Sequence, residues 1–148
     1  MYYHDFNVVL QEVPGEISLC FTISGCPLRC KGCHSPFLWK EGSGSKLTNK
    51  AYNEILCKYL SFATCVVFMG GEWHAKELIY KLKYAKSQGY KTCLYTGEET
   101  IDSKITKHLT WLKTGKWDFT KGGLSSPNTN QQFIEVATKK KLNHLFLK

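Results

Sequence analysis

Three cysteines lie within eight residues of one another, and their spacing is the strongest chemical signal in the chain. Cys26, Cys30 and Cys33 form a C-x3-C-x2-C pattern. Three thiolates held this closely suit a soft metal. If they hold a cubane iron–sulfur cluster, one iron is left without a cysteine and is open to a ligand or cosubstrate. Zinc is the alternative, with His34 or one of the remaining cysteines as its fourth ligand.

The remaining cysteines are a weaker signal, because they are not clustered. The chain has seven cysteines, an odd number that cannot all pair within one molecule. Four of them stand singly in apolar or helix-like stretches, where a free cysteine usually behaves as a small buried hydrophobe. These four are Cys20, Cys57, Cys65 and Cys93.

Alternating strand and helix patterns must position the cysteine loop. Two strand-like runs, residues 6–13 and 17–24, flank Pro14 and Gly15 and predict an N-terminal hairpin. Thr48 can cap a helix whose apolar residues recur at helical spacing. The pattern predicts further helices over 74–87 and 101–108, and further strands over 65–69, 91–95, 109–112 and 133–136.

This alternation implies right-handed crossovers and a mostly parallel sheet. In such sheets the functional site gathers at the carboxyl ends of the strands. Several polar or glycine-rich segments directly follow a predicted strand, so we expect them to share one rim. They are the cysteine loop, Gly70–Gly71–Glu72, Thr96–Gly97 and the segment that begins at Lys113.

Composition places the chain among compact globular domains. It has 148 residues, 43% of them hydrophobic, and we expect one domain over residues 1–148. No apolar run approaches the roughly 20 residues that a membrane span needs, and the N-terminus does not resemble a secretory signal. We therefore expect a cytoplasmic protein that does not bind membranes.

The net charge of +8 raises the question of nucleic acid. However, Arg29 is the single arginine among 20 basic residues. The bidentate fork that reads guanine or clamps phosphate is thus almost absent, and scattered lysines are typical of a solvated surface. We expect no nucleic-acid partner.

Residues 24–36, which contain the three cysteines, resemble the radical S-adenosylmethionine superfamily. Within it the chain is most similar to the activating proteins of anaerobic ribonucleoside-triphosphate reductase. Residues 68–72 are similar to the family's glycine-rich strand end, and residues 122–133 are similar to the closing segment of the small activases. These matches run in order over most of the chain.

The resemblance implies a partial open (βα) barrel that carries a 4Fe-4S cluster on Cys26, Cys30 and Cys33, with the cluster loop at the carboxyl-end rim of the strands. It implies that the open iron chelates S-adenosylmethionine, whose reductive cleavage gives a 5′-deoxyadenosyl radical. In activases this radical removes a hydrogen atom from a glycine of the reductase large subunit. The implied electron donor is a small protein such as a flavodoxin.

The resemblance also suggests roles for the other rim residues. Gly70 and Gly71 permit close approach of the backbone to a ligand, and Glu72 can accept a hydrogen bond from the cosubstrate ammonium. Lys113 can meet its carboxylate, and Thr96 and Gly97 can line the adenosine pocket. Each also has a plainer interpretation, as an ordinary turn or a solvated surface residue. Trp73, which follows Glu72, departs from the small residue, polar residue or proline that family members often have.

A chain of 148 residues leaves one side of such a fold open, and an open side can admit a protein loop. The size therefore favours an activase. Two alternatives stay open: a radical enzyme that acts on a small molecule, such as a deazapurine precursor, and a zinc-stabilised binding module without catalytic activity.

Overall fold

The computed structural model describes residues 1–147, and its centre is one mixed sheet of eight strands in the order β3-β1-β2-β4-β5-β6-β7-β8. The strands are β1 (Tyr2–Val9), β2 (Ser18–Ile23), β3 (Ser45–Lys46), β4 (Cys65–Met69), β5 (Lys91–Tyr95), β6 (Trp111–Thr114), β7 (Gln132–Glu135) and β8 (Lys140–Lys141). The helices are α1 (Asn49–Lys58), α2 (Ala75–Ser87) and α3 (Ser103–Thr106), and short 3-10 turns are η1 (Pro36–Trp39), η2 (Glu72–His74) and η3 (Asn143–Phe146).

The expectation of a mostly parallel sheet is wrong. Strand β4 pairs in parallel with β2 and β5, and β5 pairs in parallel with β6. The other four pairings, β1 with β2, β1 with β3, β6 with β7, and β7 with β8, are antiparallel. The physical reason is that the strands at both ends of the sheet are joined without a crossover helix, and such connections return the chain in the opposite direction.

The expected partial barrel is not confirmed. The sheet is open, with β3 and β8 as its two edge strands. The sequence carries three strand-and-helix alternations in its middle, and only these produce the parallel core. What remains of the expectation is a mixed α/β fold with an N-terminal hairpin.

The hairpin forms, but β1 lies four residues earlier than the pattern predicts. It occupies Tyr2–Val9 rather than residues 6–13, and it pairs with β2 from Tyr3 opposite Ile23 to Val9 opposite Ser18. Val13 is buried even so, with 1% of its surface exposed. Residues 10–16 therefore do not extend the strand, and Val13 packs instead into the core on one face of the sheet.

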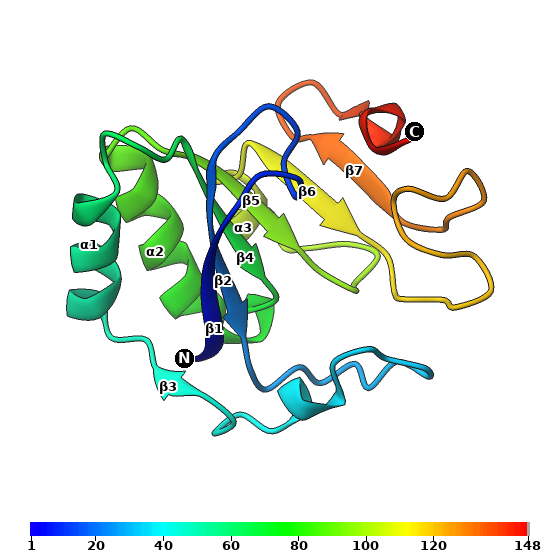
Figure 1. The fold of residues 1–148 in the computed structure, drawn as a ribbon, viewed down its shortest axis with the longest axis horizontal. Coiled ribbons are helices and arrows are strands. Elements are labelled where there is room, and N and C mark those ends of the chain that lie inside the picture. The colour runs from blue at the N-terminus through cyan, green and yellow to red at the C-terminus, as the bar shows by residue number, and fades with distance from the viewer. Residues whose placement is uncertain (148) are drawn as a thin grey trace.

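Helices cover the other face of the sheet. Figure 1 shows α1 and α2 side by side, and their apolar residues join those of the strands in the larger core. The Thr48 side chain accepts a hydrogen bond from the Ala51 backbone N–H and caps α1, as predicted. Helix α3 is shorter than residues 101–108, because Asp102 caps it and it ends at Thr106. In the described part of the chain, no helix is both long enough and apolar enough to cross a membrane.

The smaller core lies on the opposite face and is covered by loops and the C-terminal segment. Cys20, Cys65 and Cys93 are buried there. Burial raises the pKa of the Cys20 and Cys65 thiols to about 12 each, and it raises that of Cys93 as well. These three are neutral packing residues, as expected. Cys57 is the exception, since it is exposed on α1.

Candidate functional site

The cysteine loop begins where β2 ends, and backbone hydrogen bonds close its base. The N–H groups of Gly25 and Cys26 both donate to the Leu38 carbonyl, at 2.6 and 3.0 Å. The hydroxyl of the buried residue Ser24 contacts the carbonyl oxygens of Tyr2 and Glu41 at 3.2 and 2.7 Å. The two ends of the loop are thereby held together at the carboxyl end of β2.

The second half of the loop is a tight turn. The Cys33 N–H donates to the Cys30 carbonyl at 3.1 Å, and Gly32 has φ +71°. A positive φ at the third residue is the geometry of a type II turn, and it explains why glycine stands there. Arg29 has φ 49°, and its guanidinium lies 5.4 Å from the centre of the Trp39 ring.

All three cysteines are free and half-buried. Burial raises the pKa of the Cys26 thiol. Within residues 1–147, no three His, Cys, Asp or Glu side chains stand in an arrangement that could hold a metal ion directly. The donor set nevertheless fits an iron–sulfur cluster, because such clusters take cysteine thiolates and this loop presents three of them from a turn shaped by a left-handed glycine. The alternative zinc ligand His34 packs against Trp117, with ring centres 4.5 Å apart.

Gly70 and Gly71 end β4 in left-handed backbone, with φ 80° and 111°. A Cβ on Gly70 would lie 2.5 Å from Cη2 of Trp73, so a larger residue there would force the indole ring to move. The same tryptophan lies against Gly25, where a Cβ would be 3.3 Å from its Nε1. Trp73 is therefore a wedge between the cysteine loop and the end of β4. The sequence marks it as unusual, but nothing local reveals these two contacts.

Glu72 and Thr96 connect the ends of β4 and β5. The Thr96 hydroxyl donates to Oε1 of Glu72 at 2.6 Å and accepts the Glu98 N–H at 3.0 Å. The other carboxylate oxygen, Oε2, is buried and has no hydrogen-bond partner in the described chain. Burial also raises the pKa of Glu72. An unpartnered buried carboxylate oxygen is costly, and an ammonium group of a ligand would satisfy it.

Lys113 is buried rather than solvated, with 9% of its surface exposed. Its Nζ donates to the carbonyl oxygens of Gly115 and Thr96 at 3.1 and 3.5 Å. Burial lowers its pKa to about 8. The surface interpretation of this lysine is therefore wrong, and the reason is that Lys113 lies in a strand one residue from its end, where the chain on either side covers it.

Gly97 brings the end of β5 against the cysteine loop, since a Cβ at this position would collide with the side chain of Leu28. The structure thus places most of the predicted residues at one rim. Glu72, Thr96 and Lys113 are linked by hydrogen bonds, and Gly97 contacts the loop.

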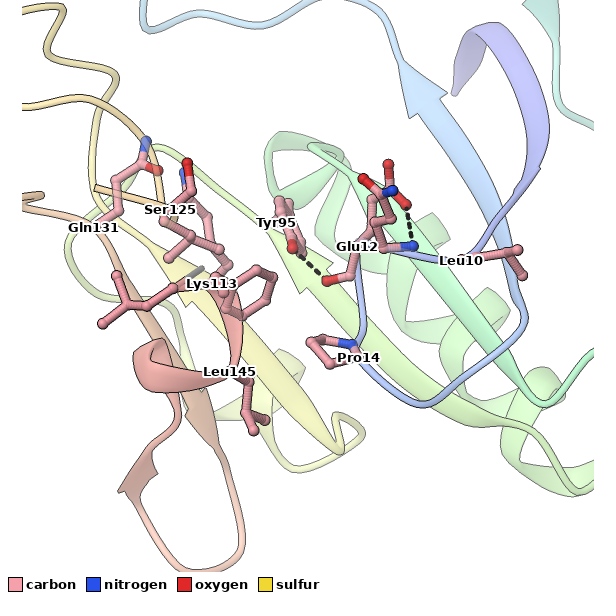
Figure 2. A pocket seen from close by; sticks show the side chains of 12 residues that line it. Leu10, Glu12, Pro14, Tyr95, Lys113, Ser125, Gln131 and Leu145 are labelled. Atoms are coloured by element: carbon pink, nitrogen blue, oxygen red, sulfur yellow. Dashed lines mark hydrogen bonds between the residues drawn. The ribbon is translucent and has the colours of Figure 1, made fainter. Parts of the chain in front are cut away.

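A cavity of about 650 Å³ opens beside this rim, on the face of the smaller core (Figure 2). Lys113 lines it, whereas the three cysteines and Glu72 do not. Tyr95 stands in its wall and donates its hydroxyl proton to the Glu12 carbonyl, which ties the β1–β2 connection to β5. The other walls come from residues 124–131 and from the C-terminal segment.

Comparison with known proteins gives the family. The model of the 4Fe-4S single cluster domain matches residues 13–113, which is more than half of the chain and includes the cysteine loop, the Gly70–Glu72 segment and Lys113. The chain therefore belongs to the 4Fe-4S single cluster domain family, and the expected 4Fe-4S cofactor is confirmed.

A more specific similarity is to the pyruvate formate-lyase-activating enzyme of Clostridium pasteurianum. The two are 36% identical over 96 residues, which cover 59% of this chain and 39% of the relative. The chain thus spans about two fifths of that relative's length. No solved structure matches the chain.

Proposed function

We propose that this protein is an iron–sulfur activase that uses S-adenosylmethionine to place a radical on a glycine of a partner enzyme. The family match supports the cluster, and the similarity to a named activating enzyme supports the reaction class. The observation that carries the proposal is the rim itself: a three-cysteine loop stands next to an unpartnered buried carboxylate oxygen and a buried lysine.

Each rim residue has a role in the proposal. Cys26, Cys30 and Cys33 hold the cluster. The free Oε2 of Glu72 accepts the ammonium of S-adenosylmethionine, and Lys113 faces its carboxylate. Gly70 and Gly71 let the backbone approach the ligand closely. Thr96 and Gly97 line the adenosine side.

A 4Fe-4S cluster held by Cys26, Cys30 and Cys33 would, once reduced, supply the one electron that cleaves the bond from sulfur to C5′ of S-adenosylmethionine, giving methionine and a 5′-deoxyadenosyl radical. That radical takes a hydrogen atom from the partner glycine, so the products are 5′-deoxyadenosine and a glycyl radical. The chain contributes by holding the amino acid group of the methionine portion, with Glu72 at the ammonium and Lys113 at the carboxylate.

We propose the large subunit of anaerobic ribonucleoside-triphosphate reductase as the partner and a flavodoxin-type protein as the electron donor. The residues around the cysteines and in the closing segment support this choice. Pyruvate formate-lyase is the second candidate, since the relative from Clostridium pasteurianum is named for it. We further propose that residues 1–148 act as one radical S-adenosylmethionine domain in the cytoplasm.

Anaerobic reconstitution with iron and sulfide tests the cofactor chemistry. We expect about four irons per chain and an EPR spectrum of the reduced protein that changes when S-adenosylmethionine is added. Release of 5′-deoxyadenosine should follow reduction. A protein that holds one zinc and takes up no iron would instead be the zinc-stabilised module.

Incubation with each purified partner then tests the target. The reductase large subunit should develop a glycyl EPR doublet, and pyruvate formate-lyase should not. A doublet on pyruvate formate-lyase alone would show that this enzyme, and not the reductase, is the target of the activase. Cleavage of the cosubstrate with no doublet on either protein would favour a small-molecule substrate.

A further inference from the structure

The connection between β6 and β7 makes a direct contact with the cysteine loop. The indole N–H of Trp117 donates to the Gly32 carbonyl at 3.1 Å. The ring of Trp117 also packs against His34, with 4.5 Å between ring centres. Trp117 is 85 residues from Gly32 in sequence, so this is a tertiary contact on the loop rather than a local one.

The contact fixes one peptide group from both ends. The Gly32 carbonyl and the Cys33 N–H belong to the same planar peptide unit. Its carbonyl accepts from Trp117 at 3.1 Å, and its N–H donates to the Cys30 carbonyl at 3.1 Å. Rotation of this peptide would break both bonds. Trp117 therefore adds a tertiary restraint to the turn between Cys30 and Cys33.

A second aromatic residue closes the outer side of the turn. A Cβ on Gly32 would lie 3.3 Å from Cδ1 of Phe119, so the phenyl ring rests directly on the glycine. Phe119 is otherwise exposed, with 62% of its surface accessible. Its position therefore reflects contact with the cysteine loop and not burial in either core.

The segment that carries these aromatics is itself anchored. The Lys116 carbonyl accepts a hydrogen bond from Nδ2 of Asn130 at 3.0 Å. The Asp118 carboxylate accepts from the N–H and the hydroxyl of Thr120, at 2.9 and 2.6 Å. Asn130, which the reaction proposed above does not use, thus supports residues 116–120 from outside that segment.

We propose that Trp117 is a positioning residue for the cluster, because it restrains the turn that carries the ligands Cys30 and Cys33. Asn130, in the closing segment, helps to hold Trp117 in place through its hydrogen bond to the Lys116 carbonyl. This inference rests on the proposed ligand set of Cys26, Cys30 and Cys33, but it does not depend on which glycine the enzyme activates or on S-adenosylmethionine.

Trp117→Phe is the direct test, because it removes the N–H and keeps an aromatic ring. Trp111→Phe is the matched control, since Trp111 is a half-buried tryptophan of β6 whose ring lies under Lys91 and not at the loop. In the reconstituted protein, we expect Trp117→Phe to speed iron release to a ferrous chelator by about three- to tenfold, the loss that one hydrogen bond predicts. The midpoint potential and the EPR spectrum should change with it, and Trp111→Phe should match the parent protein in all three.

Hydrogen exchange of the metal-free protein gives a readout without the cluster. The peptide that contains residues 30–34 should exchange faster in Trp117→Phe than in the parent, because the Gly32 carbonyl loses the hydrogen bond that restrains the Gly32–Cys33 peptide group. Asn130→Ala should act in the same direction more weakly, and it keeps the test available if Trp117→Phe does not fold. Iron release, potential and loop exchange that are the same in the parent, Trp117→Phe and Asn130→Ala would overturn the proposal.

A separate variant distinguishes failure of the ligand set from failure of this inference. Cys33→Ala should lose the cluster. If Cys33→Ala keeps a full cluster, the ligand assignment is wrong and the proposal for Trp117 falls with it. If Cys33→Ala loses the cluster while Trp117→Phe resembles the parent, the ligands are right and only the positioning role is wrong.

Discussion

Burial gives Glu72 and Lys113 chemical properties that the same residues lack on a surface. The pKa of Glu72 is raised and that of Lys113 is lowered to about 8, in both cases mainly because the charged form loses water. Each is therefore unstable as an isolated charge and gains most from a ligand of opposite charge. An amino acid moiety, with one ammonium and one carboxylate, supplies both partners.

The buried charge of Lys113 makes stability depend on pH in a defined window. Below about pH 8 the lysine is protonated in both the folded and the unfolded chain, so the folded state carries the full desolvation cost. This cost disappears as the pH rises from about 8 to 10.5, because the folded chain releases its proton first. Lys113→Met should therefore gain stability relative to the parent at pH 7, and this difference should shrink by up to about 3 kcal/mol across the window.

Urea unfolding of the reduced, metal-free protein at several pH values measures this difference. Lys50→Met is the control, since Lys50 is exposed and this variant removes a lysine without touching the buried site. A difference between Lys113→Met and the parent that does not vary with pH would show that the lysine is not desolvated.

Alanine substitutions at Gly70 and Gly15 distinguish the cost of backbone strain from the cost of a steric collision. Both have positive φ, 80° and 86°, but a Cβ on Gly15 would meet nothing within 4 Å, whereas one on Gly70 would meet Trp73. We expect Gly15→Ala to cost about 1–2 kcal/mol through conformation alone. Gly70→Ala should cost about 2–4 kcal/mol, because overpacking adds to that. Thermal or urea unfolding of the two variants measures both, and equal costs would argue against the Trp73 wedge.

At the scale of elements, local patterns predict β4 and β5 better than β1, β6 and β8, and β6 occupies Trp111–Thr114 rather than residues 109–112. Strands β4 and β5 have the predicted bounds, because each is a short apolar run ended by residues that break a strand. The prediction that β1 extends to Val13 is wrong. Val13 is apolar because it packs against the smaller core from the loop after β1, and not because it belongs to the strand. Strand β8 carries two exposed lysines and has no apolar signal.

The candidate site likewise contains some residues that a local sequence pattern predicts and others that it does not. The cysteines and the glycine-rich strand end can be recognised from the sequence, because the residues of each motif lie close together along the chain. The burial of Lys113 and the contacts of Trp73 and Trp117 depend on segments that lie far away along the chain, so no local pattern reveals them.

The ends of β4 and β5 act together through one hydroxyl. Thr96→Val removes the hydrogen bond to Glu72 and leaves the shape of the side chain. We expect it to weaken the binding of S-adenosylmethionine to the reconstituted protein by about three- to tenfold, as measured by equilibrium dialysis. Thr92→Val is the control on the same strand, because its hydroxyl donates to the His108 carbonyl at 2.6 Å instead of contacting the rim. If both variants bind equally well, Thr96 does not orient Glu72.

At the scale of the whole molecule, the fold and the cluster loop are supported separately. Neither core contains any residue from 25 to 44, the stretch that holds all three cysteines. The sheet is therefore expected to fold without iron, and the cluster adds stability only by binding the folded state.

Loss of the cluster should accordingly leave the sheet intact. We expect the metal-free parent and the triple variant Cys26→Ala, Cys30→Ala, Cys33→Ala to unfold cooperatively, with midpoints within about 3 °C of each other. Circular dichroism during heating measures this. A broad, non-cooperative transition of the metal-free parent would show that the cluster is needed for folding.

The placement of the aromatic residues has a practical consequence. Of the four tryptophans, Trp39 lies at Arg29, Trp73 at Gly25 and Trp117 at Gly32, so three of them surround the cysteine loop and only Trp111 lies apart. Iron–sulfur clusters absorb in the near ultraviolet, where indoles emit. The tryptophan fluorescence of the unlabelled protein should therefore decrease as the cluster assembles and increase as oxygen destroys it. Cofactor occupancy can then be followed without any added label.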